Sequence, residues 1–319
     1  MDNIMWTAED EAIIATNTDA TECKRCAVEL GYWKDDYIGF FAKRAERKAP
    51  EINRGYYARV KGMEMFIHQF LERCGTKCQI INLGCGFDTL YWRLEDATRA
   101  GINFIELDFP TVTAKKCHII KRNKQLLEKI TREDGEVALG AGGGELHADG
   151  YHLVGCDLRS LGDVRRALAA ARAAPDAPTL ALAECVLVYL RPEPARALLA
   201  HLAAAFPRLA LLVYEQCSLD DTFGEVMARN LAARGCALAG DWQRAAPAEQ
   251  AARLRALGFD AARAWDMGAV WRALPDDDRA RVERLEMLDE RELLQQLHAH
   301  YALTVATRGD LFADMDLNA

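Results

Sequence analysis

The feature that most constrains the fold of this chain is a pair of apolar runs joined through a turn that contains two glycines. Residues 80–83 have the pattern of a short buried strand, which leads directly into Gly84 and Gly86. The second run, residues 102–107, ends in Asp108. In this layout the backbone can approach a ligand closely, and the carboxylate can accept hydrogen bonds from a ribose diol. The pattern therefore predicts a nucleotide-type cofactor site.

The turn lacks the third glycine of the dinucleotide-binding fingerprint, because Thr89 stands in its place within a helical pattern at residues 87–94. That fingerprint serves a pyrophosphate, which S-adenosylmethionine does not have. The sequence thus favours methyl transfer over nicotinamide or flavin chemistry. The glycines could also serve packing alone, but the spacing of Asp108 favours a cofactor site.

Three further apolar runs also end in an acid, and helical patterns separate them. They are residues 152–156 before Asp157, 179–183 before Glu184 and 209–214 before Glu215. Short strands that alternate with helices predict a parallel sheet covered on both faces, with its ligand beyond the carboxyl ends of the strands. The expected fold class is α/β, a Rossmann-like class I methyltransferase sheet, mostly parallel with a C-terminal antiparallel strand.

The rest of the chain is predicted to surround this sheet. An N-terminal helical cap, residues 1–75, precedes a methyltransferase domain, residues 76–319, within one integrated globular unit. After the fifth strand we expect a helical insertion at 219–234, helix 247–257, strand 259–265, helix 277–298 and strand 301–307. Residues 140–144 are glycine-rich and are expected to form a flexible surface loop.

Within the cap, residues 48–59 carry an unusual group of Asn, Arg and Tyr side chains. Pro50 and Gly55 predict a break in the helical pattern, so that Arg59 lies next to a turn. An arginine there can hold a carboxylate through paired, charge-assisted hydrogen bonds. The alternative is a solvated charge on a helix surface.

Composition narrows the functional class. The net charge of −8 argues against a nucleic-acid binder, and no apolar run approaches the ~18 residues of a membrane span. The ten cysteines lie mostly in apolar patterns and no secretory segment precedes them, so we expect free thiols, a cytoplasmic location and no metal site. His298 and His300 are expected to be solvated surface side chains.

Several segments resemble the leucine carboxyl methyltransferase family, whose members act on protein phosphatase 2A. The most specific are GYWKDDY (31–37), RKAPEINRGYYARV (47–60), NLGCGFDTLYWRL (82–94) and AECVLVYL (183–190). The resemblance extends from about residue 20 to about residue 307. It implies an S-adenosylmethionine-dependent enzyme that esterifies the α-carboxylate of the C-terminal leucine on the phosphatase catalytic subunit, acting as a monomer without nucleic acid or membrane partners.

The resemblance also implies roles for individual residues. Lys24 and Arg59 would hold the methionine carboxylate of the cofactor, and Asp108 would bind its ribose. The other implied cofactor-binding residues are Gly84 and Gly86 in the turn, Asp157 and Leu158 beside the adenine, and Glu184 at the end of the fourth strand. No general base is expected, because a C-terminal carboxylate is already ionised at neutral pH. Arg59 and Tyr189 are candidates for positioning the substrate.

Two alternatives stay open on the sequence alone. A related methyltransferase acts on a carboxyl-bearing wybutosine precursor in tRNA, but it carries a long repeat-containing extension, and no internal repeat is found in these 319 residues. A non-catalytic phosphatase-binding protein could also retain this fold. The acids expected to face the cofactor favour an enzyme.

Overall fold

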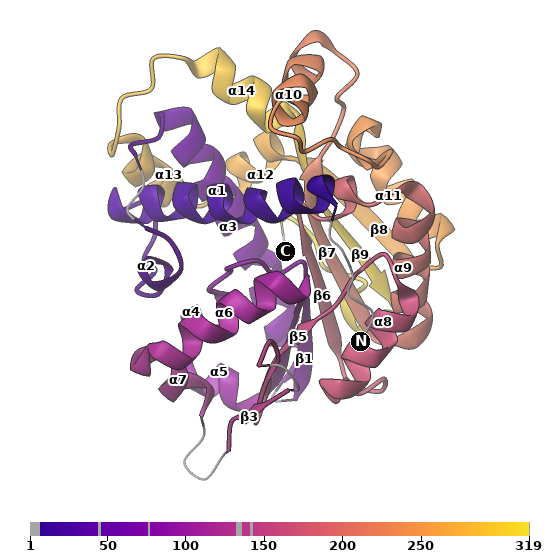
Figure 1. Ribbon diagram of the computed structural model, residues 1–319. Coiled ribbons are helices and arrows are strands. Elements are labelled where there is room, and N and C mark those ends of the chain that lie inside the picture. The colour runs from indigo at the N-terminus through magenta and orange to yellow at the C-terminus, as the bar shows by residue number, and fades with distance from the viewer. Residues whose placement is uncertain (1–6, 44–45, 76, 132–135, 141–142, 319) are drawn as a thin grey trace.

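A computed structural model describes residues 7–43, 46–75, 77–131, 136–140 and 143–318. Within these residues, nine strands form one sheet in the order β3-β4-β5-β2-β1-β6-β7-β9-β8 (Figure 1). The five central strands are parallel: β5 (Tyr151–Gly155), β2 (Ile102–Asp108), β1 (Cys78–Leu83), β6 (Thr179–Glu184) and β7 (Leu209–Gln216). They are the five predicted strands, and the predicted fold class is confirmed.

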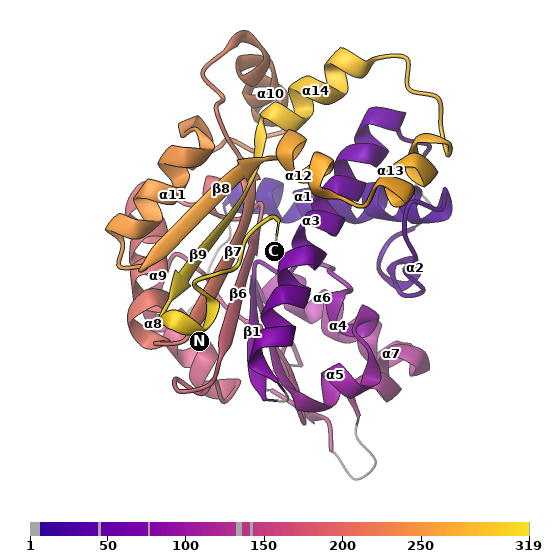
Figure 2. The ribbon, with the colours of Figure 1, turned by 180° about the vertical axis from the view of Figure 1, so that it is seen from behind.

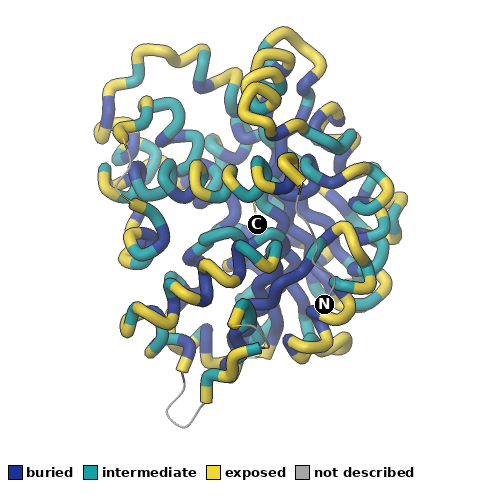
Figure 3. The backbone as a smooth tube through the Cα atoms, viewed as in Figure 1, coloured by how far each residue is buried: buried dark blue, intermediate teal, exposed yellow. Residues whose placement is uncertain are grey.

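Helices cover both faces of the parallel strands. The residues of two hydrophobic clusters alternate along each strand, so that one cluster lies on each face. One face is covered by α3 (Pro50–Cys74), α4 (Leu90–Arg93), α6 (Pro110–Arg122), α7 (Lys124–Ile130) and α12 (Met267–Ala273). The other is covered by α8 (Leu161–Ala170), α9 (Pro192–Ala205) and α11 (Pro247–Ala256). Figure 3 shows the strands as a buried block inside these helices.

Antiparallel strands extend the sheet at both edges. On one side β9 (Tyr301–Arg308) pairs with β7 and with β8 (Ala261–Asp266), as predicted (Figure 2). On the other side the glycine-rich segment connects two strands that were not predicted, β3 (Ala138–Leu139) and β4 (Leu146–Ala148). Residues 141 and 142 of the predicted loop lie outside the described part of the chain.

The predicted break at Pro50 and Gly55 is wrong, because α3 (Pro50–Cys74) runs through both residues without interruption. Proline is tolerated in the first turn, where an N–H would have no helical partner. A glycine inside a helix costs about 1 kcal/mol, and α3 offsets this cost by burying large side chains such as Phe66 against the sheet. Arg59 therefore lies on a continuous helix.

The predicted helix at residues 277–298 is also wrong. The structure has two helices there, α13 (Asp276–Glu283) and α14 (Arg291–Ala299). In the segment between them, the buried carboxylate of Glu286 accepts hydrogen bonds from Asn53 Nδ2 at 2.8 Å and from the Tyr32 hydroxyl at 3.0 Å. These contacts with the cap hold the segment in a non-helical path, and helical periodicity gives no sign of them.

The two histidines near the end of α14 are buried, so the expectation of a solvated pair is wrong. The ring of His298 lies 5.8 Å from that of Trp271, and His300 Nε2 lies 3.0 Å from Asp221 Oδ1. The reason is tertiary, because α14 packs against α3, α12 and β9.

The first helix, α1 (Ala8–Glu29), lies across the carboxyl ends of the parallel strands (Figure 1). Thr7 and Asp10 form a reciprocal capping box at its start. After β6 comes the short helix η1 (Leu187–Tyr189), and α10 (Thr222–Ala232) follows β7. In the part of the chain that the structure describes, no helix combines the length and the apolar character needed to cross a membrane.

Candidate active site

A cavity of about 390 Å³ lies at the carboxyl edge of the parallel strands, between the strand ends and α1. Its volume is typical of a small-molecule site, and it lies beside β1 and β6, where the strand order changes direction. All the residues expected to serve the site line this cavity: Lys24, Arg59, Gly84, Gly86, Asp108, Asp157, Leu158, Glu184 and Tyr189. Residues far apart in the sequence thus meet at one place.

The two glycines of the turn are required by its geometry. Gly84 and Gly86 have φ angles of 61° and 49°, which side chains disfavour. A Cβ atom on Gly84 would lie 2.7 Å from Val186 Cγ2, and one on Gly86 would lie 2.5 Å from Asn17 Oδ1. The same Asn17 oxygen accepts the N–H of Phe87 at 2.9 Å. Asn17 was not predicted, since nothing in the sequence of α1 links it to this turn.

Asp108 ends β2 and binds the backbone of the glycine turn. Its Oδ2 accepts the N–H of Gly86 at 2.7 Å, and its Oδ1 accepts the N–H of Phe109 at 2.7 Å. Each oxygen keeps a second lone pair for a ligand hydroxyl. Burial raises the pKa of Asp108 to about 6, although both backbone bonds favour the charged form. The carboxylate is therefore mostly ionised at neutral pH.

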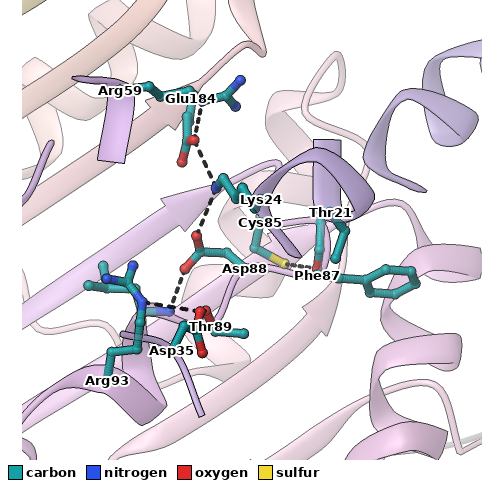
Figure 4. Close-up of polar contacts among 12 residues, drawn as sticks. Thr21, Lys24, Asp35, Arg59, Cys85, Phe87, Asp88, Thr89, Arg93 and Glu184 are labelled. Carbon is teal, nitrogen blue, oxygen red and sulfur yellow. Dashed lines mark hydrogen bonds and ion pairs between the residues drawn. The ribbon is translucent and has the colours of Figure 1, made fainter. Parts of the chain in front are cut away.

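Four side chains of alternating charge form a chain along the cavity (Figure 4). Arg59 Nε donates to Glu184 Oε1, and Lys24 Nζ lies 3.0 Å from the same oxygen and 3.4 Å from Asp88 Oδ2. Burial alone would raise the pKa of Glu184, but Arg59 and Lys24 outweigh it and hold the pKa of this carboxyl below its usual range. Glu184 is thus ionised at neutral pH, and it orders two cations at this end of the cavity.

Arg59 is not a solvated surface charge. Its side chain is only 11% exposed, and its guanidinium carbon lies 4.9 Å from the centre of the Tyr214 ring and 5.3 Å from that of Tyr56. Cation–π contacts of this kind strengthen when the pair is removed from water. Arg59 is therefore held rigidly, with aromatic rings around it.

On the far side of β1 and β2, Asp157 and Leu158 follow β5 and line the cavity. Arg159, which was not predicted, also lines it and binds both oxygens of the Asp157 carboxylate, with Nε at 2.9 Å from Oδ1 and Nη2 at 2.9 Å from Oδ2. The Arg159 guanidinium lies 5.4 Å from the centre of the Phe109 ring. An arginine two residues after a strand-end acid is a signal that could have drawn attention to it.

Glu215, the fourth acid at a strand end, does not line the cavity. It is fully buried, and its Oε1 accepts the N–H of Val186 at 2.7 Å and that of Leu187 at 2.6 Å. Burial raises the pKa of Glu215 to about 8, although the backbone hydrogen bonds and the nearby charge of Arg59 both act to lower the pKa. Glu215 thus holds the turn that follows Glu184.

This arrangement has the groups that an S-adenosyl ligand needs. The glycine turn leaves room for close approach, Asp108 offers acceptors for a ribose, and Lys24 and Arg59 offer cations for an amino-acid carboxylate. No group of three or more His, Cys, Asp or Glu side chains is placed to hold a metal ion among the described residues. The fold and the site together define an S-adenosylmethionine-dependent methyltransferase.

Comparison with known proteins gives the family. The sequence profile described as "Leucine carboxyl methyltransferase" matches residues 12–203. The chain is 41% identical over 302 residues to leucine carboxyl methyltransferase 1 of Bos taurus, covering 94% of this chain and 91% of that protein. The corresponding protein of Caenorhabditis elegans is 39% identical over 309 residues, covering 94% and 92%. The chain belongs to the leucine carboxyl methyltransferase family.

Two further similarities bear on the fold and on the alternative function. The human tRNA wybutosine-synthesizing protein 4 is 36% identical over 307 residues, which is 94% of this chain but only 44% of that protein. A solved structure of a putative methyltransferase from Thermobifida fusca YX has a TM-score of 0.51 at 12% identity, covering 91% of this chain and 94% of that one. The latter supports the fold alone.

Proposed function

We propose that this enzyme transfers the methyl group of S-adenosylmethionine to the α-carboxylate of the C-terminal leucine of the protein phosphatase 2A catalytic subunit. The observation that carries the proposal is the near full-length identity of 41% to a leucine carboxyl methyltransferase 1. The cavity agrees with it, because a buried arginine and several tyrosines line it next to the cofactor turn.

We assign roles to the site residues that their positions in the cavity support. Lys24 and Arg59, ordered by Glu184, bind the methionine carboxylate of the cofactor. Asp108 binds the ribose, and the turn at Gly84 and Gly86 allows close approach of the cofactor to the backbone. At the other end of the cavity Asp157 and Leu158 frame the adenine. Tyr189 on η1 and the remaining face of Arg59 position the acceptor carboxylate.

The chemistry needs no general base. A C-terminal carboxylate has a pKa near ~3.5 and is already a nucleophile at neutral pH. Bound S-adenosylmethionine supplies an electrophilic methyl group on a sulfonium. What the chain must do is strip water from the acceptor and align it, and proximity and orientation can supply roughly 7–11 kcal/mol of such a barrier. The cavity between α1 and the strand ends suits this task.

The proposal is tested by transfer of labelled methyl from S-adenosylmethionine to purified phosphatase 2A catalytic subunit. Intact subunit should be labelled, and the label should be released by mild alkali, as expected for an ester. Subunit that lacks the terminal leucine, or carries an amidated terminus, should remain unlabelled. Label that persists on either substrate, or survives alkali, would contradict the proposed acceptor.

The same assay with unmodified and precursor-bearing tRNA tests the alternative, which the similarity to the wybutosine-synthesizing protein motivates. Labelling of tRNA at a rate comparable with that of the phosphatase would favour it. We expect none, since a chain with a net charge of −8 lacks the general basic character of RNA-binding proteins.

A further inference from the structure

Arg159 connects two parts of the molecule that lie on opposite sides of the cofactor cavity. With one side of its guanidinium it binds both oxygens of the Asp157 carboxylate after β5. With Nη1 it reaches Asp10 Oδ1 at 2.6 Å, in the first turn of α1. One side chain therefore joins the sheet to the helix that covers the cavity.

Asp10 is well suited to receive this contact. Its other oxygen, Oδ2, accepts the backbone N–H of Thr7 at 3.0 Å and its hydroxyl at 2.9 Å, which completes the capping box of α1. The Asp10 side chain is only 4% exposed, whereas that of Arg159 is 37% exposed. Because Asp10 is removed from water, the ion pair is stronger than an exposed surface pair.

Helix α1 forms much of one wall of the cavity, from Ala12 to Lys24. A ligand bound in this cavity therefore lies against α1, and movement of α1 away from the strand ends would open this wall of the cavity. Among the described residues, the N-terminal half of α1 is bonded to the strand ends by Asn17, which accepts the Phe87 N–H of the glycine turn, and by Asp10, which accepts from Arg159. Nearer the C-terminal end of α1, Lys24 pairs with Glu184 and Asp88. In the N-terminal half only the Arg159–Asp10 bond joins two charges, and through Arg159 it links α1 to Asp157, which is expected to frame the adenine.

We propose that Arg159 is a further cofactor-site residue with two roles. It fixes Asp157 beside the adenine, and through its bond to Asp10, here called the clasp, it holds α1 over that end of the cavity. Both contacts slow the release of S-adenosyl ligands. This inference rests on the proposed role of Asp157 and Leu158 at the adenine end. It does not depend on which carboxylate receives the methyl group.

The test measures dissociation of S-adenosylhomocysteine from the full chain without any methyl acceptor, so the outcome is independent of the proposed substrate. Arg159→Ala removes the clasp and the support of Asp157. Asp10→Asn breaks the ion pair while it keeps an oxygen that can cap α1. In each variant the dissociation rate should rise roughly 10-fold, the factor expected for loss of one charge-assisted bond. The association rate should change much less.

The double variant and a matched control make the result decisive. Because both side chains act through one bond, Arg159→Ala with Asp10→Asn should release the ligand no faster than Arg159→Ala alone. Arg281 provides the control, since it ties the chain just after α1 by donating to the carbonyls of Gly31 at 2.8 Å and Tyr32 at 2.7 Å, away from the cavity. Arg281→Ala should change the dissociation rate less than twofold.

Three results would contradict the proposal that the Arg159–Asp10 bond slows ligand release. The first is an unchanged dissociation rate in Asp10→Asn with a native circular dichroism spectrum. The second is additive acceleration in the double variant, and the third is equal acceleration in Arg281→Ala, which would mean that any loosening of α1 has the same effect. If only Arg159→Ala fails to fold, the comparison of Asp10→Asn with Arg281→Ala still decides the question.

Discussion

Asp108 and Glu215 occupy equivalent places in the sheet, and yet they serve different purposes. On one side, each lies one residue beyond the last pair with the adjacent strand, because the last pairs are Leu107 with Leu83 of β1 and Tyr214 with Glu184 of β6. On the other side, Asp108 pairs with Gly155 of β5 and Glu215 pairs with Ala302 of β9. Each carboxyl group accepts backbone N–H groups from the turn that follows the neighbouring strand. In both cases burial raises the pKa of the carboxyl group.

The difference lies in the turns. The turn beside Asp108 has glycines at positive φ and leaves the carboxylate open to the cavity. The turn beside Glu215 carries side chains throughout, and Cys185 adopts a φ of 57° without being a glycine. Val186 of this turn fills the space above Gly84. One acid therefore faces a ligand site, whereas the other supports the wall of that site from inside.

The largest effect that separates the two acids should be on stability. Glu215→Ala leaves two buried N–H groups without an acceptor, which should lower the free energy of unfolding by about 2–5 kcal/mol. Asp108→Ala should lower it less, because water in the cavity can replace the carboxylate. Urea denaturation of both variants checks this. Equal losses would mean that the two acids do not differ in the way described.

The second effect concerns cofactor binding. Asp108→Ala should weaken S-adenosylmethionine binding by about 1.5–3 kcal/mol, because the ribose loses charge-assisted hydrogen bonds. Isothermal titration calorimetry measures the change. A folded variant that binds with unchanged affinity would remove Asp108 from the site.

The third effect is the pH dependence of binding. The pKa of Asp108 is about 6, so protonation below that pH removes the charged acceptor. Between pH 7 and pH 5 the affinity for S-adenosylmethionine should fall roughly tenfold, or about 1.4 kcal/mol. Titrations at several pH values with Asp108→Asn as the control test this, since the variant should not show a transition near pH 6.

The smallest effect is expected for Glu215→Gln at pH 5. At this pH the amide replaces a protonated carboxyl group of similar shape, so the free energy of unfolding should change by less than about 1 kcal/mol. Burial raises the pKa of Glu215 from 4.5 to about 8, so in this window the native state holds a proton that the unfolded chain releases. Wild-type stability should therefore fall from pH 5 to pH 8 relative to the variant. Denaturation at both pH values measures the difference, and parallel curves would contradict the raised pKa.

The parallel sheet could be predicted because its signals are local. Each strand is a short apolar run bounded by a turn or an acid. The spacing from Gly86 to Asp108 predicted a cofactor site at a place where the structure has a cavity. The orientation of Glu215 could not be predicted, since the same pattern of a strand followed by an acid describes it and Asp108 equally well. Only the residues of the neighbouring turn distinguish the two.

The parts that sequence reasoning missed depend on contacts over long distances in the chain. The cap helix α3 continues past Gly55 because one face of the helix packs against the sheet. The helix predicted at 277–298 is interrupted because Glu286 binds Asn53. Asn17 is missing from the predicted site for the same reason, because no periodicity or motif connects it with the Phe87 N–H. For Arg159 the local contact with Asp157 could have been noticed, but its bond to Asp10 could not.

The place of β9 in the sheet has a consequence for how the chain is made. β9 is the last strand in the sequence but lies between β7 and β8, and within the described residues β8 pairs with β9 alone. All residues of β7 are buried in the folded protein. When β7 leaves the ribosome, one of its edges has no partner until β9 follows some 90 residues later. A free strand edge is a template for pairing with other chains. The interval between the synthesis of β7 and that of β9 is therefore a stage at which the nascent chain is open to pairing with other chains.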